Sequence, residues 1–376
     1  MQRDVFGLIY AGEESPRLGE LISKRNVSAL PVAGRYRVID FILSNMVNSN
    51  IRNIGIITKR NYQSLMDHLD AGKDWDLSRK KDGLFILPPY DTVENSGVHE
   101  GMVDSLAGAG AYLRRVPQEY CLYSSASLVY NFTYNKMFKQ HIETGADITI
   151  LYAERGAGSS RCVSNFSNLM MEMDENKRVR NAHFCTDRDE QGAVGMECIL
   201  IKKELLRYLL DNAVARNKHN LIQDVILENI HRLRVYGYEY DGYVSKIDNV
   251  AGYYKTNMDM LLPDVQKDLF FQSNSIYTKT KDEAPAKYGA NAVVHNSLIA
   301  SGCVIEGTVE NSVLFRGVYV APGVHLKNCV VMQDSQIYEK ASLDKVILDK
   351  NVSIRPGSVL AGNEMYPVII PKGAIA

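Results

Sequence analysis

The residues best suited to chemistry lie near the start of the chain, where an apolar run leads into a polar loop. Residues 5–10 (VFGLIY) have the composition of a buried strand, and residues 12–16 (GEESP) follow it. The loop after a parallel strand commonly receives a nucleotide, because small residues there let backbone N–H groups approach phosphate oxygens. Here Glu13 and Glu14 would repel phosphate, and Pro16 has no N–H to donate. The stretch has the position of a nucleotide loop but the wrong side chains for one.

Composition limits the possible classes of protein. A length of 376 residues indicates two domains, and a net charge of −1 argues against nucleic acid or an anionic membrane as a partner. No apolar run reaches the roughly 18 residues that a membrane span needs. The six cysteines include no CxxC pair, which favours reduced thiols in a cytoplasmic protein. The eight histidines show no HxH or HxxxH spacing, so we expect no His/Cys metal site.

Elements that could position this loop alternate along residues 1–262, as βαβ units do. We expect strands at 51–58, 119–124 and 148–153, and a strand pair formed by 169–185 and 195–201. Helical spacing is found at 39–47, 62–69, 101–115, 134–144, 204–210, 221–233 and 253–262. The sequence therefore predicts a Rossmann-like α/β domain with a mostly parallel sheet.

The sequence pattern of residues 289–376 differs from that of the preceding domain. Short apolar stretches alternate with Gly, Asn, Asp and Ser, and their apolar anchors recur at steps of four to nine residues, mostly five or six. A second repeat, Asn-Ser-Leu-Ile at 296, Asn-Ser-Val-Leu at 311 and Asn-Cys-Val-Val at 328, recurs every 15 to 17. These periods predict a left-handed parallel β-helix of hexapeptide repeats rather than a β-sandwich. Residues 263–288 are charged and contain proline, so they are predicted to be a linker.

Several runs resemble one enzyme family over nearly the whole chain. They include GRYRVIDFILSNMVNSNIRNIGIIT at 34–58 and YYKTNMDML at 253–261. With the order of the two domains, they resemble the glucose-1-phosphate adenylyltransferases (ADP-glucose pyrophosphorylases) of bacterial glycogen synthesis. The resemblance implies that the Rossmann-like domain is nucleotidyltransferase-like. The resemblance implies that a sugar phosphate attacks the α-phosphorus of a nucleoside triphosphate and releases pyrophosphate. Because two anions must meet, such a reaction requires Mg²⁺ and fixed cations.

The chain departs from the family at the positions that carry this chemistry. Its loop keeps Gly12 and Arg17 of the family's GGxGTRL-like run but lacks the other glycines and the threonine. Val27 stands where the family has a phosphate-binding lysine. Ser127 and Lys246 stand where it has two Mg²⁺-binding carboxylates. A serine and a cation in these places should abolish a magnesium site.

The sugar-phosphate side is altered as well. The family's FxEKP-like lysine has no counterpart in residues 179–185, whereas Gly101 and Asp104 of a GTADA-like turn remain. The resemblance leaves a vestigial pocket of Gly12, Arg17, Arg25, Gly101 and Asp104. Gly101 and Asp104 could hold the start of a helix rather than bind a ligand.

The losses together predict a non-catalytic, regulatory glycogen biosynthesis subunit of the family. Removal of one preorganised electrostatic group typically lowers a rate by ~10²–10³. The resemblance implies a partner, the catalytic ADP-glucose pyrophosphorylase chain, in a heterotetramer that the regulatory chain activates; alone the chain could form a homo-oligomer. No cofactor is expected here, since Mg²⁺ would be required only by the catalytic partner.

Other readings of the same residues remain open. The chain could be a nucleotide- or sugar-phosphate-sensing subunit, or an active sugar-1-phosphate nucleotidyltransferase in which Asp248 is a shifted metal ligand. An acyltransferase would need His295 or His325 on a coil face. In the altered pocket, Lys246 could pair with Glu13, Glu14 or another acid, or bind an anionic effector.

Overall fold

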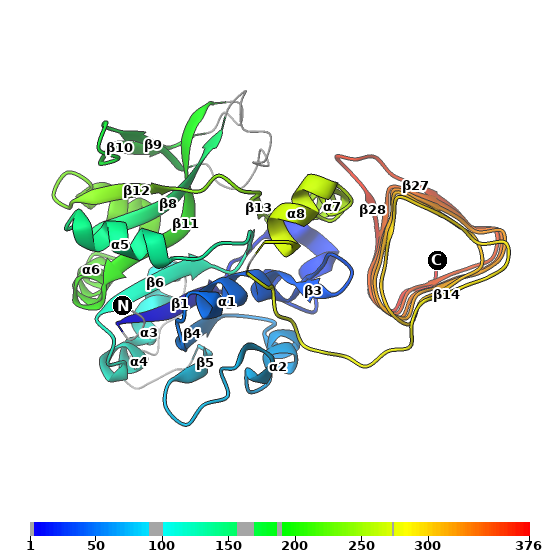
Figure 1. Cartoon of the computed structure of the whole chain (residues 1–376), viewed down its shortest axis with the longest axis horizontal. Helices are drawn as coiled ribbons and strands as arrows, with labels where there is room; N and C mark the ends of the chain where they lie inside the picture. The colour runs from blue at the N-terminus through cyan, green and yellow to red at the C-terminus, as the bar shows by residue number, and fades with distance from the viewer. Residues whose placement is uncertain (1–3, 90–100, 156–168, 186–189, 273) are drawn as a thin grey trace. The chain divides into compact units, whose positions relative to one another are not determined.

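A computed structural model describes residues 4–89, 101–155, 169–185, 190–272 and 274–376 (Figure 1). The chain forms two compact units. The first contains Met1–Glu14, Ile39–Lys246 and Gln272–Tyr277, and the second contains Ser15–Val38, Ile247–Phe271 and Thr278–Ala376. Three separate segments therefore build each unit. The predicted division at residues 262 and 289 follows the sequence pattern and stays a prediction.

The first unit is built on a nine-stranded sheet. Seven strands follow in the order β10-β9-β11-β6-β1-β4-β5, and β8 pairs with β11 and β12. Their bounds are β1 Val5–Ala11, β4 Asn53–Thr58, β5 Gly83–Leu87, β6 Tyr120–Ser125, β8 Ile148–Arg155, β9 Leu169–Met173, β10 Val179–Phe184, β11 Gly192–Lys202 and β12 Val235–Glu239. β1 lies between β4 and β6 and is parallel to both. All seven of its residues are buried, as is usual for a central strand of a parallel sheet.

Helices pack on this sheet close to where the hydrophobic spacing predicts them. They are α1 Val38–Asn48, α2 Gln63–Leu69, α3 Met102–Gly108, α4 Gly110–Arg115, α5 Asn135–Glu143 and α6 Lys203–Ala215. The helix predicted over 101–115 is broken at Ala109, between two glycines that weaken helix formation. The helix predicted over 221–233 is shorter than expected, with a π turn at Leu221–Ile226 and a 3₁₀ turn at Leu227–Asn229.

The second unit contains a parallel β-helix, which Figure 1 shows end-on as a triangle. Its three sheets have five parallel strands each, in the orders β14-β17-β20-β23-β26, β15-β18-β21-β24-β27 and β16-β19-β22-β25-β28. The Asn repeat is explained by the turns, because Asn296, Asn311 and Asn328 all have positive φ. Asn296 Nδ2 also donates to Asn311 Oδ1 at 2.8 Å, which links neighbouring coils. The predicted fold class, a mostly parallel α/β domain followed by a hexapeptide β-helix, is confirmed.

The β-helix strands are short and evenly distributed. The first sheet contains β14 Lys287–Tyr288, β17 Val304–Ile305, β20 Tyr319–Val320, β23 Gln336–Ile337 and β26 Ser353–Ile354. The second contains β15 Val293–His295, β18 Thr308–Glu310, β21 His325–Lys327, β24 Ser342–Asp344 and β27 Val359–Ala361. The third contains β16 Leu298–Ile299, β19 Val313–Leu314, β22 Val330–Val331, β25 Val346–Leu348 and β28 Val368–Ile370.

Two helices and an early segment of the chain complete the second unit. The helices are α7 Val250–Asp259 and α8 Pro263–Phe270, and the early segment has 3₁₀ turns at Pro16–Ile22 and Val27–Ala29 and a hairpin of β2 Pro31–Val32 and β3 Tyr36–Arg37. Tyr253 of α7 donates to Pro31 O at 2.7 Å, and Tyr254 donates to Asn328 O at 2.7 Å. α7 thus holds both the early segment and the β-helix. α8 lies inside the predicted linker: Pro263 opens it, and Val265 and Leu269 are buried.

No helix among the described residues is long and apolar enough to cross a membrane.

Candidate functional site

The altered pocket of the first unit begins where β1 and β6 end. Tyr10 lies opposite Ser125 in this parallel pair, so the loop after β1 and the turn after β6 leave the sheet side by side. Ala126 N donates to Tyr10 O at 2.9 Å and fixes the turn. Glu13 and Ser127 therefore meet at the carboxyl edge of the sheet, where α/β proteins bind ligands.

Glu13 fills this edge with its own carboxylate. Ser125 Oγ donates to Glu13 Oε1, and Ser125 Oγ also lies 2.8 Å from Ser127 Oγ. Burial raises the pKa of the Glu13 carboxyl; Lys246 acts against this shift, and the negative charge of Glu197 adds to it. An internal carboxylate is thus bound to the two serines, one of which is at the predicted metal position.

Lys246 is the cation of this cluster. β13 (Ser245–Lys246) pairs with β7 (Leu128–Val129), just after the turn that holds Ser127. Lys246 Nζ donates to Glu197 Oε1, and their side chains are only 16% and 21% exposed. The expectation that Lys246 pairs with an acid in the pocket is confirmed, and the main partner is Glu197.

This arrangement does not suit the chemistry of the family motif. The described residues contain no group of three His, Cys, Asp or Glu side chains placed to hold a metal ion. Lys246 is paired with Glu197 here, and Mg²⁺ requires several oxygen ligands without a competing cation. The Glu13 side chain and its serine partners occupy the edge where the phosphates would lie. The residues at the predicted metal positions therefore do not fit Mg²⁺.

Gly12 and Glu14 have local structural roles. A Cβ on Gly12 would lie 3.0 Å from the Tyr10 ring and 3.1 Å from Lys59 Cβ, so a larger residue would be crowded. Glu14 is exposed and accepts a hydrogen bond from Lys59 Nζ at 3.0 Å. This bond lowers the pKa of the Glu14 carboxyl. The second acid of the loop is thus also neutralised by a neighbouring lysine.

Gly101 and Asp104 hold the start of α3. Gly101 N donates to Asp104 Oδ2 at 3.0 Å, and the same oxygen lies 3.1 Å from His219 Nδ1. A Cβ on Gly101 would lie within 2.6–2.9 Å of His219 atoms, so only glycine fits here. The expected helix-start role of this pair is confirmed.

The remaining vestigial residues belong to the second unit. Arg17 is exposed on the first 3₁₀ turn, and Val27 is buried. Arg25 Nη2 donates to both carboxylate oxygens of Asp349 at 2.7 Å, and Arg25 Nη1 lies 3.5 Å from Met332 Sδ. The side chains of Arg25 and Asp349 are 3% and 2% exposed, so the bidentate ion pair is fully buried.

A partly buried lysine lies next to this ion pair. Burial, reinforced by the charges of Arg37 and Arg25, lowers the pKa of Lys350 to about 7, and Lys372 acts in the same direction. Asp349 is the one group that acts against this shift. The second unit therefore gathers four basic side chains around one carboxylate.

Sequence reasoning missed Glu197 and Asp349. Glu197 lies on the mostly buried strand β11 between buried Met196 and Cys198, and an acid in such a strand signals the need for a partner. Asp349 follows β25 in a turn, where an aspartate is usually exposed, so no local signal marks it.

The residues that the alternative functions would require do not form a cluster of their own in the described structure. Asp248 accepts a hydrogen bond from Asn249 Nδ2 at 2.5 Å, just before α7. His325 Nε2 lies 3.7 Å from Glu310 on the neighbouring coil, and His295 is exposed on β15.

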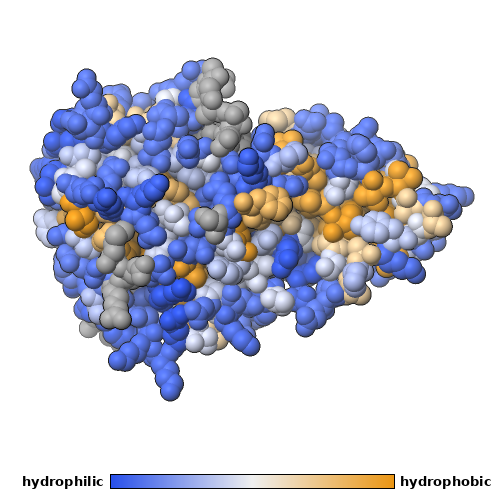
Figure 2. Space-filling model, in the orientation of Figure 1, coloured by the Kyte–Doolittle hydropathy of each residue, from blue (hydrophilic) through white to orange (hydrophobic). Residues whose placement is uncertain are grey.

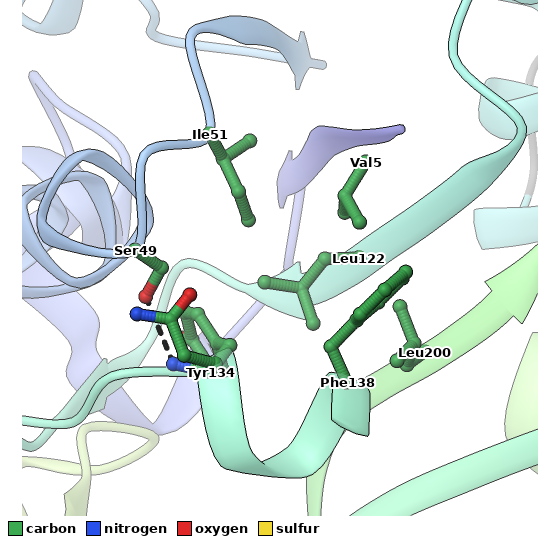
Figure 3. A pocket seen from close by; sticks show the side chains of 8 residues that line it. Val5, Ser49, Ile51, Leu122, Tyr134, Phe138 and Leu200 are labelled. Carbon is green, nitrogen blue, oxygen red and sulfur yellow. Dashed lines mark hydrogen bonds between the residues drawn. The ribbon is translucent and has the colours of Figure 1, made fainter. Parts of the chain in front are cut away.

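A separate cavity opens at the other end of the central strands (Figure 3). It is lined by Val5, Ser49, Ile51, Leu122, Tyr134, Asn135, Phe138 and Leu200. Tyr134 N donates to Ser49 Oγ at 2.8 Å on one wall. The lining is mainly apolar, with Tyr134 as its one ionisable side chain, so this cavity does not offer acid–base or phosphate chemistry.

The two units define the class of protein. Residues 6–162 match the nucleotidyl transferase family, and residues 283–365 match the GlmU-like C-terminal hexapeptide family. The chain is thus a nucleotidyl transferase-type protein with a hexapeptide β-helix.

Individual similar proteins show which family of nucleotidyl transferases the chain belongs to. The chain is 36% identical to glycogen biosynthesis protein GlgD of Bacillus subtilis (strain 168), over 95% of this chain and 93% of the relative. It is 37% identical to GlgD of Geobacillus stearothermophilus, over 100% and 98% of the two chains. It is 30% identical to glucose-1-phosphate adenylyltransferase of Fervidobacterium nodosum, over 94% and 85%. The chain belongs to the ADP-glucose pyrophosphorylase family of glycogen synthesis, which includes both kinds of relative.

Proposed function

We propose that this chain is the non-catalytic regulatory subunit of a bacterial ADP-glucose pyrophosphorylase, which associates with the catalytic chain and activates it. The observation that carries the proposal is the filled pocket of the first unit. Glu13 is held by Ser125, and Lys246 is paired with Glu197, where the family motifs would place metal and phosphate ligands. The similarity to two GlgD proteins supports the same role.

The size of the expected loss in catalytic rate supports an inactive chain. One missing electrostatic group lowers a rate by ~10²–10³, and here the loop, the phosphate lysine and both metal ligands differ. The separate losses need not add, because such groups act together. Even two independent losses would lower turnover by roughly 10⁴.

Activation would then be conformational. A partner can shift a catalytic chain toward its active state only by binding that state more tightly. Couplings of this kind are typically about 1–3 kcal/mol, which corresponds to about 5–150-fold. We expect stimulation within that range.

The test is synthesis of ADP-glucose from ATP and glucose 1-phosphate with Mg²⁺. The purified chain is assayed alone, then with the catalytic chain of the same organism. We expect no turnover alone and several-fold stimulation in the mixture. A mixture with an inactivated catalytic chain is the control and should give no product. Turnover by the isolated chain would contradict the proposal and make Asp248 the first residue to re-examine.

A second candidate function is the sensing of an anionic metabolite, such as a nucleotide or sugar phosphate. The cluster of Arg25, Arg37, Lys350 and Lys372 favours it, since burial and then the neighbouring positive charges lower the pKa of Lys350 to about 7. A bound phosphate group would relieve their repulsion. In a thermal-shift titration with inorganic phosphate, the wild type should gain more stability than Lys350→Met. Lys327→Met, which alters an exposed lysine of β21, is the matched control. Equal gains in all three proteins would exclude this site.

A further inference from the structure

A further pocket of the first unit lies where α6 ends. Residues from the last turns of α6 line it, together with residues from the π turn at Leu221–Ile226 and from the segment that follows this turn. Its apolar lining comes from Leu209, Ala213 and Val225, which are all buried. The pocket shares no lining residue with the acidic cluster at the sheet edge or with the basic cluster around Lys350.

The loop between α6 and the π turn is held by its own charged side chains. Lys218 Nζ donates to Asp224 O at 3.2 Å and also to Glu228 Oε2. Asp224 Oδ2 accepts the backbone N–H groups of His219 and Asn220 at 3.1 and 2.8 Å. Lys218 and Asp224 therefore both have internal partners, and their bonds link the end of α6 to the π turn.

Two arginines of the pocket lack such a partner. Arg216 and Arg232 line the pocket and are both exposed. Within the part of the chain that the structure describes, neither guanidinium forms an ion pair. The lining thus has three basic side chains and one acidic one, and two of the basic groups are unpaired. Guanidinium groups match phosphate oxygens through paired N–H donors, so the pocket suits a phosphate group.

Other arginines of the same unit are paired. Arg207, also on α6, donates to Glu204 at 3.1 Å, and Arg234 lies 3.0 Å from Asp147. Figure 2 shows mainly hydrophilic residues on the visible face of this unit, so charged side chains are common there. The distinguishing feature of Arg216 and Arg232 is that they lie in a pocket without a carboxylate partner.

Neutral polar groups lie in the same pocket. Asn212 Nδ2 donates to Tyr208 O at 2.8 Å, and Asn229 Nδ2 donates to Val225 O at 2.7 Å. These bonds orient both amides and leave their carbonyl oxygens as acceptors for hydroxyl groups. Tyr208 also lines the pocket and is 65% exposed, so its ring offers a surface for the organic part of a ligand.

We propose that this pocket binds a phosphate monoester whose organic part carries hydroxyl groups. The phosphate pairs with Arg216 and Arg232. The hydroxyl groups donate to Asn212 and Asn229, and the organic part packs on Tyr208. The site belongs to this chain alone and needs no residue of a catalytic partner, so it goes beyond the proposed regulatory function.

Calorimetric titration of the full chain with ribose 5-phosphate tests the proposal. We expect Arg216→Gln and Arg232→Gln each to weaken binding roughly tenfold, because each loses a hydrogen bond between charged groups. Both positions are exposed, so the variants should fold. Arg207→Gln is the matched control on α6 and should bind like the wild type. Ribose without the phosphate should not bind, and inorganic phosphate should bind more weakly than the ester.

The other outcomes would overturn the proposal. Wild-type chain that binds no ribose 5-phosphate would do so, as would equal affinities of the wild type, Arg216→Gln and Arg232→Gln. Binding that is lost in Lys350→Met but kept in both arginine variants would assign the ligand to the cluster around Lys350 instead. Ribose that binds as tightly as its phosphate ester would show that the ligand class is wrong. The catalytic chain is absent from these titrations, so their failure leaves the proposed regulatory function standing.

Discussion

The first unit places a lysine between two glutamates, whereas the second places an aspartate among four basic side chains. In the first cluster, Lys246 is paired with Glu197, and Glu13 is held by Ser125. In the second, both carboxylate oxygens of Asp349 accept hydrogen bonds from Arg25, and the neighbouring Lys350 has a lowered pKa. One cluster has an excess of acid and the other an excess of base.

The difference shows how the two units depart from phosphate chemistry. The acidic cluster lies at the sheet edge where a nucleotide would bind, and its side chains are bonded to one another there. The basic cluster retains the positive charge that phosphate recognition needs, but its most buried arginine has an internal partner. The four predictions below break or sharpen this comparison, from the largest expected effect to the smallest.

The largest effect should come from Arg25→Met. The substitution leaves the buried carboxylate of Asp349 without its partner, and loss of one member of a buried pair costs about 3–5 kcal/mol. Urea unfolding measures the change. Arg234→Met is the control, because its side chain is 55% exposed beside Asp147, so loss of this pair should lower stability much less. The double variant Arg25→Met/Asp349→Leu should recover much of the loss next to Met332. Equal losses in Arg25→Met and Arg234→Met would contradict the prediction.

Lys350→Met should alter stability at alkaline pH. The folded state lowers the pKa of Lys350 from 10.5 to about 7, so between these values the unfolded chain binds a proton that the folded chain does not. Wild-type stability therefore gains from this group as pH rises from 7 to 10.5. The gain should be about 1–3 kcal/mol after allowance for solvent screening. Melting temperatures from pH 7 to 10 should show that Lys350→Met lacks this gain and Lys327→Met keeps it. Parallel curves for both variants would disprove the assignment.

Glu13→Gln should change the pH dependence in the opposite direction. Burial raises the pKa of Glu13, so the contribution of this group to wild-type stability is greatest below pH 4.5. That contribution falls as pH rises through the pKa of the folded state. At pH 8 the amide variant should therefore be more stable than the wild type, relative to its difference at pH 4.5. Glu14→Gln tests the sign of this pH dependence. Lys59 lowers the pKa of Glu14, so this variant should instead lose stability at pH 8. The prediction is wrong if the stabilities of Glu13→Gln and Glu14→Gln, relative to wild type, change in the same direction between pH 4.5 and pH 8.

The smallest effect is expected from Ser127→Asp. The change restores a metal carboxylate of the family motif, but Val27, Glu13 and Lys246 remain. We expect no pyrophosphate release with ATP, glucose 1-phosphate and Mg²⁺ when the catalytic chain serves as the positive control. Measurable turnover from this single change would mean that the pocket needs only one further ligand.

The fold could be predicted where side chains follow a simple period. The apolar positions at 39, 42, 43, 46 and 47 specify α1, and the repeated Asn-Ser turns specify the coils of the β-helix. α8 was missed because its charged surface hides a short buried face of Val265 and Leu269. The break at Ala109 depends on two flanking glycines, whose effect on a helix varies with its packing.

The candidate site could be predicted only where a family motif marked it. Glu13, Ser127 and Lys246 were found at motif positions, and the structure brings them together. Glu197 and Asp349 were not found, because their partners come from distant parts of the chain. The ion pair of Arg25 and Asp349 joins positions 324 residues apart, which no local period can reveal.

That separation has a consequence for synthesis of the protein. Ribosomes add about 5–20 residues per second, so Arg25 waits roughly 16–65 seconds before Asp349 is made. Throughout that time the early segment lacks the carboxylate that neutralises its arginine and the coils against which it packs. The second unit is therefore completed only after nearly the whole chain has been translated, and its earliest residues are among the last to reach their native contacts.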